Sequence, residues 1–187
     1  MSDTATTRTR SRALKTAATV SLAALTVWGV AAVWAFRFPR TDPLGDTDAY
    51  YVLASSGGIS ALRSVYRWLP EGKPLLVSVA EKDKDFPLYR YACAEPGLDI
   101  TCVHPDPVST QGEAHNLARV ARERGWRSVT VISQRSHMTR ARVLMKRCWD
   151  GEVRMVARDV QVGPRVWLRA LVYESGAMVK TWLTPGC

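Results

Sequence analysis

Residues 16–36, from Thr16 to Phe36, form a run of 21 residues without a charged side chain. The run is rich in Ala, Val and Leu, and as a helix it would be about 31 Å long, which matches the hydrocarbon core of a bilayer. A helix in the core of a soluble domain does not fit, because the segment is apolar on every face. The run therefore predicts a transmembrane helix.

The charges on either side of this run predict its orientation. Four basic residues, Arg8, Arg10, Arg12 and Lys15, precede it, and Arg37 and Arg40 follow it. This excess favours a cytoplasmic N-terminus and a globular part outside the cytoplasm. A cleaved signal peptide is the alternative, but its apolar core is usually about 7–15 residues and ends at a small-residue site. We expect residues 1–15 to be a cytoplasmic basic tail, 16–36 an uncleaved single-pass anchor in the cytoplasmic membrane, 37–47 a linker and 48–187 an extracytoplasmic domain.

The formal charge of +9 on 187 residues would usually suggest a nucleic-acid partner. However, the first 40 residues alone hold six basic residues and one acidic residue. A second concentration runs from Arg119 to Arg147, where nine basic residues are opposed only by Glu123. Nucleic-acid binding would require this surface to face the cytoplasm, so we expect no nucleic-acid partner.

All four cysteines lie in the globular part: Cys93, Cys102, Cys148 and Cys187. An even number outside the cytoplasm permits two disulfides, with three possible pairings. Cys93–Cys102 is the local candidate, and it would leave Cys148 to pair with Cys187. Four free thiols are the alternative, and they would require the opposite topology. The sequence has no C-x-x-C motif, so no metal site is predicted.

Short apolar runs alternate with segments of helical periodicity between residues 48 and 187. The runs predict strands at 48–54, 73–79, 98–103, 127–133 and 152–157, and the periodic segments predict helices at 59–69, 84–95, 110–124, 136–149 and 164–183. The strands are apolar on both faces, which is typical of a parallel sheet covered by helices. The sequence therefore predicts a doubly wound α/β domain with a mostly parallel sheet of about five strands.

In such domains ligands bind beyond the carboxyl ends of the strands, which places loops 55–58, 104–112 and 133–137 together. The first loop begins with Ser55, Ser56 and Gly57. Its backbone N–H groups could hold an anion, although a simple turn would have the same composition.

The second loop leads into the helix predicted at 110–124. Ser109 or Thr110 can cap this helix, and Glu113 stands three residues beyond Thr110, as in a capping box. Asn116 lies one helical turn after Gly112, so we expect its side chain at the mouth of the same ligand-binding region.

The third loop follows Ser133, and His137 and Arg140 then share one face at a helix start. A histidine and an arginine at a helix N-terminus suit a phosphate or another anion. His137 could also act as a general acid or base. The alternative is an ordinary helix with solvated charges.

Three segments together resemble the SanA/ElyC/YdcF family: S-T-Q-G-E-A-x-N-L-A from Ser109, R-S-V-T-V-I-S from Arg127, and S-H-M-x-R-A from Ser136. The resemblance covers about residues 48–148, with a weaker echo at Tyr173-Glu174. It implies a Rossmann-like fold, one N-terminal transmembrane helix and a role in the bacterial envelope. SanA-like members are linked to the envelope barrier and vancomycin exclusion, and ElyC-like members to peptidoglycan precursors and lipid carriers. Neither the residues nor the resemblance indicates a cofactor.

These observations lead to the hypothesis of an envelope protein that binds or processes an anionic metabolite, phosphorylated or linked to a lipid. The expected catalytic groups are His137 and Glu113; the expected ligand-binding groups are Ser55, Ser56, Gly57, Thr110, Asn116, Ser133 and Arg140. A hydrolase or a transferase would fit these groups. The alternative is a non-catalytic binding or scaffold protein, because the family usually has Ser-Gly-Gly where this chain has Ser78-Val79-Ala80.

Overall fold

The computed structural model describes residues 3–54, 65, 67, 69–79, 93, 99–158 and 160–187, with side chains from Arg12 onward. The helices predicted at 59–69 and 84–95 lie almost entirely outside these residues, apart from single positions such as the helical Val65.

A parallel sheet of five strands forms the centre of the globular part. Its strands are β1 (Ala49–Val52), β2 (Leu75–Ser78), β3 (Ile100–Val103), β4 (Ser128–Gln134) and β5 (Glu152–Arg158). The strand order is β3-β2-β1-β4-β5, and every neighbouring pair is parallel. The predicted α/β class and five-strand parallel sheet are confirmed.

Apolar side chains cover both faces of the sheet, because successive residues of a strand point to opposite sides. On one face Tyr51 packs with Leu117 of helix α4 (Thr110–Arg124) and Met145 of helix α5 (Met138–Cys148). On the other face Tyr50 packs with Val65 and Ile132. The β1 tyrosines are fully buried on opposite faces, so the central strand anchors both halves of the core.

The helix bounds follow local signals closely. Ser109 caps α4, since its Oγ accepts the N–H of Gly112 at 3.2 Å, and Gly125 ends the helix in the left-handed region at φ 69°. The predicted helix 136–149 is instead a short 3₁₀ turn, η3 (Arg135–His137), followed by α5. Helix α6 (Pro164–Leu183) has the predicted bounds, with proline in its first turn.

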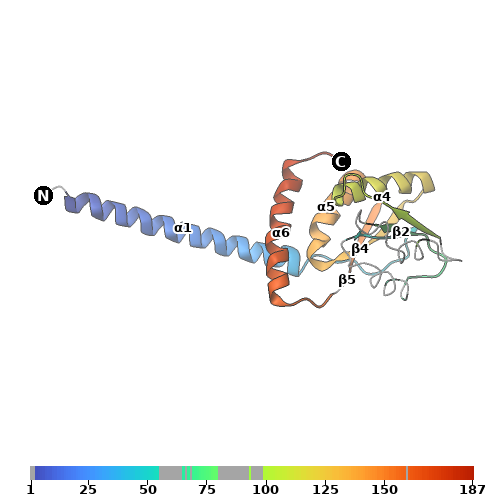
Figure 1. The fold of residues 1–187 in the computed structure, drawn as a ribbon, viewed down its shortest axis with the longest axis horizontal. Coiled ribbons are helices and arrows are strands. Elements are labelled where there is room, and N and C mark those ends of the chain that lie inside the picture. The colour runs from blue at the N-terminus through green and yellow to red at the C-terminus, as the bar shows by residue number, and fades with distance from the viewer. Residues whose placement is uncertain are drawn as a thin grey trace.

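Helix α1 (Asp3–Arg37) is a long rod that projects from the globular part, and α6 lies across its inner end (Figure 1). Ala32 and Phe36 of α1 are buried against Met178 of α6. Residues Arg12–Arg37 are long and apolar enough to cross a membrane, and few of their side chains are buried by the protein. The predicted span 16–36 lies within this helix.

The segment predicted as a linker, residues 37–47, is fixed to the domain. The backbone N–H of Asp42 donates to the carbonyl of Met155 on β5 at 2.8 Å, and the Asp42 carboxylate accepts the N–H of Met155 at 2.8 Å. The same carboxylate pairs with Arg142 of α5 at 2.7 Å. These bonds fix the chain within a few residues of the end of α1.

The two disulfides are those expected from the pairing that begins with the local Cys93–Cys102 bond. Cys93 is bonded to Cys102, and Cys148 at the end of α5 is bonded to Cys187 at the C-terminus. The second bridge encloses α6, so it ties the residues that follow this helix to α5.

We expect Asp42→Ala to lower the free energy of unfolding by about 1–3 kcal/mol, because the Met155 N–H and the Arg142 guanidinium lose their acceptor. Thermal unfolding of the full chain in detergent measures the change. The matched control is Asp46→Ala, which removes only an exposed pair with Lys73. Equal effects of the two substitutions would show that the segment is not fixed through Asp42.

Candidate functional site

A cavity of about 360 Å³ lies beyond the carboxyl ends of β1, β3 and β4. The predicted loops after β3 and β4 contribute to it, and α6 closes one side. The lining residues are Ala54, Pro105, Val108, Ser109, Thr110, Glu113, Gln134, Ser136, His137, Arg140, Ala170, Tyr173 and Glu174.

The start of α4 presses closely against the loop after β3. A Cβ on Gly112 would lie 2.0 Å from the carbonyl oxygen of Pro107, so no larger residue fits without moving that backbone. This close approach brings Thr110, in the first turn of α4, beside the start of α5.

His137 lies at the centre of a buried polar network, with only 5% of its surface exposed. Its Nε2 is 3.2 Å from the Thr110 hydroxyl, and its Nδ1 is 3.2 Å from Oε1 of Glu174. The network thus joins α4, η3 and α6 through one imidazole ring.

Arg140 connects the same groups from α5. It forms a two-pronged pair with Glu174, from Nε to Oε2 at 2.8 Å and from Nη2 to Oε1 at 3.1 Å. Its Nη1 donates to Thr110 Oγ1 at 2.8 Å. The predicted shared face of His137 and Arg140 is present, with Nδ1 and Nη2 only 2.9 Å apart.

Two proton assignments divide this network. With the proton on Nδ1, His137 donates to Glu174 and the Thr110 hydroxyl can donate to Nε2, but Nη2 of Arg140 then faces a second donor at 2.9 Å. With the proton on Nε2, Nδ1 accepts from Nη2 and Nε2 donates to Thr110. Only the first tautomer leaves Nε2 able to accept a proton, with Glu174 placed to stabilise an imidazolium. Hydroxyl, imidazole and carboxylate are connected in the order that general-base chemistry requires.

Glu174 is ionised in this setting. Burial alone raises the pKa of a carboxyl group, but the hydrogen bonds and charges of His137 and Arg140 outweigh it, so the pKa of Glu174 lies below its ordinary value. The side chain is 7% exposed, so solvent screens the pair only weakly.

Glu113 lines the cavity, but its carboxylate does not cap its own helix as the capping-box pattern suggested. Its Oε1 accepts the backbone N–H of Ala54 at 2.8 Å, just beyond the end of β1. Tyr51 donates its hydroxyl to the Glu113 carbonyl at 3.2 Å, and burial, followed by the Glu113 charge, holds the pKa of this tyrosine well above its ordinary value. Glu113 therefore joins α4 to the central strand as well as facing the cavity.

Two of the predicted ligand-binding residues are placed away from the cavity lining. Asn116 donates its amide to the carbonyl of His104 at 2.9 Å, so it holds the loop after β3 rather than pointing at the mouth. Ser133 is fully buried in β4. Ser55, Ser56 and Gly57 lie outside the described residues.

The sequence pattern did not select Glu174 or Tyr173 as site residues. Glu174 lies within an otherwise apolar stretch of α6, and a single buried acid there is the signal that could have indicated a partner. Tyr173 extends the lining, and Arg140 lies 6.0 Å from the centre of its ring.

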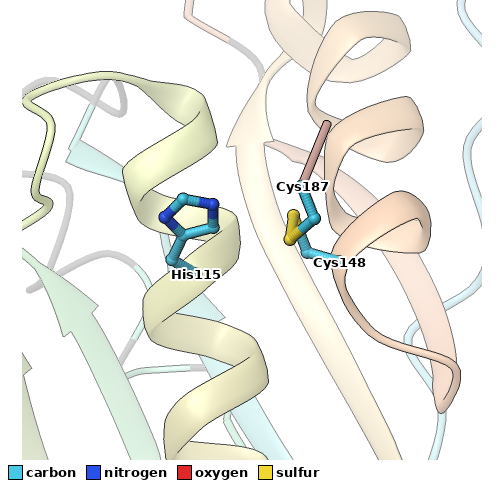
Figure 2. Close-up of side chains that lie close together, drawn as sticks. All are labelled: His115, Cys148 and Cys187. Carbon is cyan, nitrogen blue, oxygen red and sulfur yellow. A yellow bond between two sulfur atoms is a disulfide. The ribbon is translucent and has the colours of Figure 1, made fainter. Parts of the chain in front are cut away.

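A cluster of metal-ligand residue types occurs elsewhere in the described part of the chain. His115 of α4 lies beside Cys148 and Cys187, with all three ligand atoms within 4.8 Å of one another (Figure 2). Both sulfur atoms are engaged in the disulfide, whereas metal binding by cysteine requires thiolates. In this state the cluster is a disulfide bond beside a histidine.

Comparison with known proteins gives no assignment: no family model matches the chain, and no curated protein matches it significantly in sequence.

We expect Glu174→Gln to lower the free energy of unfolding at pH 7 by about 3–5 kcal/mol, because the buried guanidinium of Arg140 loses its carboxylate partner. The folded-state pKa of Glu174 is depressed, so its contribution is present above the ordinary value of 4.5 and is lost as pH falls below it. The difference between native and variant should therefore shrink as the pH falls below about 4.5. Urea unfolding at several pH values measures this.

The matched control is Glu152→Gln, which removes an exposed pair with Arg154. A Glu174→Gln effect that is independent of pH would show that the lost interaction does not depend on the carboxylate charge.

Proposed function

We propose that this chain is a membrane-anchored envelope protein whose cavity binds and processes an anionic, phosphorylated or lipid-linked envelope metabolite. The observation that carries the proposal is the buried connection Thr110–His137–Glu174, held by Arg140, at the carboxyl edge of a parallel sheet. Buried ion pairs with a purely structural role are common. A histidine fixed between a hydroxyl and a carboxylate in a cavity, however, is the arrangement that general acid–base catalysis uses.

His137 is the acid–base group of this proposal. Nε2 accepts a proton from a hydroxyl or a water molecule at the position of Thr110 Oγ1, and Glu174 stabilises the resulting imidazolium through Nδ1. The reaction is a hydrolysis or a group transfer: the activated oxygen bonds to the electrophilic centre, the bond from that centre to the leaving group breaks, and the imidazolium of His137 returns its proton to the leaving group.

The anion is held by donors around the cavity. Arg140 supplies the positive charge, and the N-termini of α4 and of η3–α5 converge on the same space, with their partial positive charges. A phosphate that engages Arg140 would compete with Glu174 for the guanidinium.

The fold proposed here is the doubly wound, Rossmann-like arrangement. The strand order supports it, since the chain runs outward from β1 first through β2 and β3 and then through β4 and β5. Apolar clusters on both faces of the sheet also support it. This arrangement and the membrane helix are features expected of a SanA-like protein, and we propose membership of that family on these grounds.

A non-catalytic binding or scaffold protein is the second candidate. It is favoured by the charge balance of the cavity, because Arg140 is already neutralised by Glu174 and a second carboxylate, Glu113, lines the same space. In that case the network would serve only to hold α6 on the domain.

The two candidates differ in their response to substitution of His137. We expect both His137→Gln and Arg140→Ala to leave a deletion strain permeable to a large antibiotic such as vancomycin. We also expect a phosphorus-containing ligand to copurify with the full chain, and only Arg140→Ala to reduce its amount. The His137 variant should retain ligand but lose function. Antibiotic sensitivity and mass spectrometry of the extracted ligand measure the two effects.

Controls for this experiment are His104→Ala and Arg119→Ala, whose side chains lie outside the cavity lining. Full rescue of the strain by both site variants would remove the case for a site-based role. Rescue by the His137 variant alone would favour the binding protein.

We further propose that the N-terminus is cytoplasmic and that residues 48–187 lie outside. A reporter enzyme that is active only in the periplasm, fused after Cys187, should be active, and a cytoplasm-dependent reporter at the same position should be inactive. The two disulfides support this orientation, since they persist in oxidising compartments. The opposite reporter pattern would rule out the orientation and the envelope role together.

A further inference from the structure

Helix α6 carries an exposed apolar stripe that the proposed catalytic role does not use. The stripe consists of Leu168, Val172, Val179 and Leu183, which are between 50% and 77% exposed. Their spacing puts them on one side of the helix, opposite the side that buries Glu174, Met178 and Thr181 against the domain. A soluble domain rarely leaves such a stripe uncovered along a helix of 20 residues.

The position of α6 along α1 indicates what covers it. A bilayer core of about 30 Å corresponds to roughly 20 residues of helix, so a span that begins after Lys15 ends near Ala35. Ala32 and Phe36 are the residues of α1 that pack against Met178 of α6. The inner end of the apolar run thus meets α6 at the depth where the hydrocarbon core would end.

The direction of α6 agrees with this depth. It lies across α1, and α1 projects on the side of α6 away from the sheet (Figure 1). A helix that crosses a membrane-spanning helix at its end lies along the membrane surface. The side of α6 that faces away from the domain then faces the bilayer, and this is the side of the apolar stripe.

The charges of α6 suit the headgroup layer. Its exposed charged residues, Arg165, Arg169 and Lys180, are all basic, and its one acid, Glu174, is buried. Arg37, at the end of α1, stacks on Trp167 of α6 with 5.0 Å between the guanidinium carbon and the ring centre. On the membrane-facing side, Trp182 is 64% exposed and lies next to the apolar stripe. Basic side chains and an exposed tryptophan beside such a stripe are typical of helices that lie in the interface of an anionic membrane.

We infer that α6 is an interfacial helix, seated in the headgroup layer of the bilayer that α1 spans. The inference rests on α1 crossing the membrane, and it adds a second contact that fixes the domain on the surface. Because Ala170, Tyr173 and Glu174 of α6 line the cavity, the site lies within about one helix diameter, roughly 10–12 Å, of the lipid. A ligand carried by a lipid therefore reaches the cavity without leaving the membrane.

Nitroxide labelling of single cysteine variants tests this in the full chain. All four native cysteines are paired, so the label attaches to the introduced thiol. The variants are Val172→Cys and Val179→Cys on the stripe, Val27→Cys on α1, and Arg122→Cys on the exposed surface of α4. Each is reconstituted in vesicles of phosphatidylethanolamine and phosphatidylglycerol, and the accessibility of the label to oxygen and to a water-soluble nickel chelate is measured by electron paramagnetic resonance.

We expect the ratio of oxygen to nickel accessibility to be highest at position 27. At positions 172 and 179 the ratio should be several-fold above that of the Arg122→Cys control, which should have the lowest ratio. A stripe label that behaves like the control while position 27 is in lipid would overturn the docking of α6 and leave the anchor intact. Nickel access at position 27 would overturn the anchor as well. Protection of the stripe from both reagents, with spin–spin coupling between labels, would show that a second copy covers α6 and would contradict the inference. None of these readings depends on activity, so they stand apart from a failure of the proposed chemistry.

Discussion

The pair between Arg140 and Glu174 is the interaction on which the arrangement of this molecule depends. It is buried, two-pronged and formed between helices that are consecutive in the chain but separated by strand β5. Removing one partner of such a pair leaves an uncompensated charge in a dry setting, which is far more costly than the pair itself is favourable. The pair therefore contributes less to stability than to specifying the position at which α6 docks. Helix α6 in turn closes the cavity and contacts the end of α1.

A consequence for chemistry follows from this dependence. Glu174, which contacts His137, also helps to attach α6, together with Arg147 and the Cys148–Cys187 disulfide. The proposed acid–base geometry therefore exists only while that helix is docked. An anion that drew Arg140 away from Glu174 would weaken both. In the proposed function, anion binding and the docking of α6 are thus coupled through one guanidinium, and this coupling does not require any movement of the sheet.

Much of the fold could be predicted from the sequence, because the apolar runs are short, β-rich and separated by clear helix signals. The bounds of α4 and α6 agree at both ends, since Gly125, Pro164 and the residues around them are strong local signals. The site was only partly predictable. His137, Arg140 and Thr110 converge as expected. Asn116, however, bonds to the loop just before its own helix, whose conformation spacing does not reveal, and Glu113 bonds to Ala54, 59 residues away. Glu174 could not be selected by spacing, because its partners are more than 30 residues away and only the packing of α6 brings them together.

The segment that follows α1 has an effect beyond holding the domain. Strand β5 is an edge strand of the sheet. The N–H and carbonyl of Met155, which point away from the sheet, are both hydrogen-bonded to Asp42. An edge strand whose backbone groups are unpaired is a template for the addition of a strand from another molecule. The proposed membrane anchor would confine copies of the chain to two dimensions and raise their encounter rate, so such strand addition would be more frequent than in free solution. By occupying the backbone of Met155, in the middle of β5, the segment interrupts the row of groups with which another strand would pair at this edge.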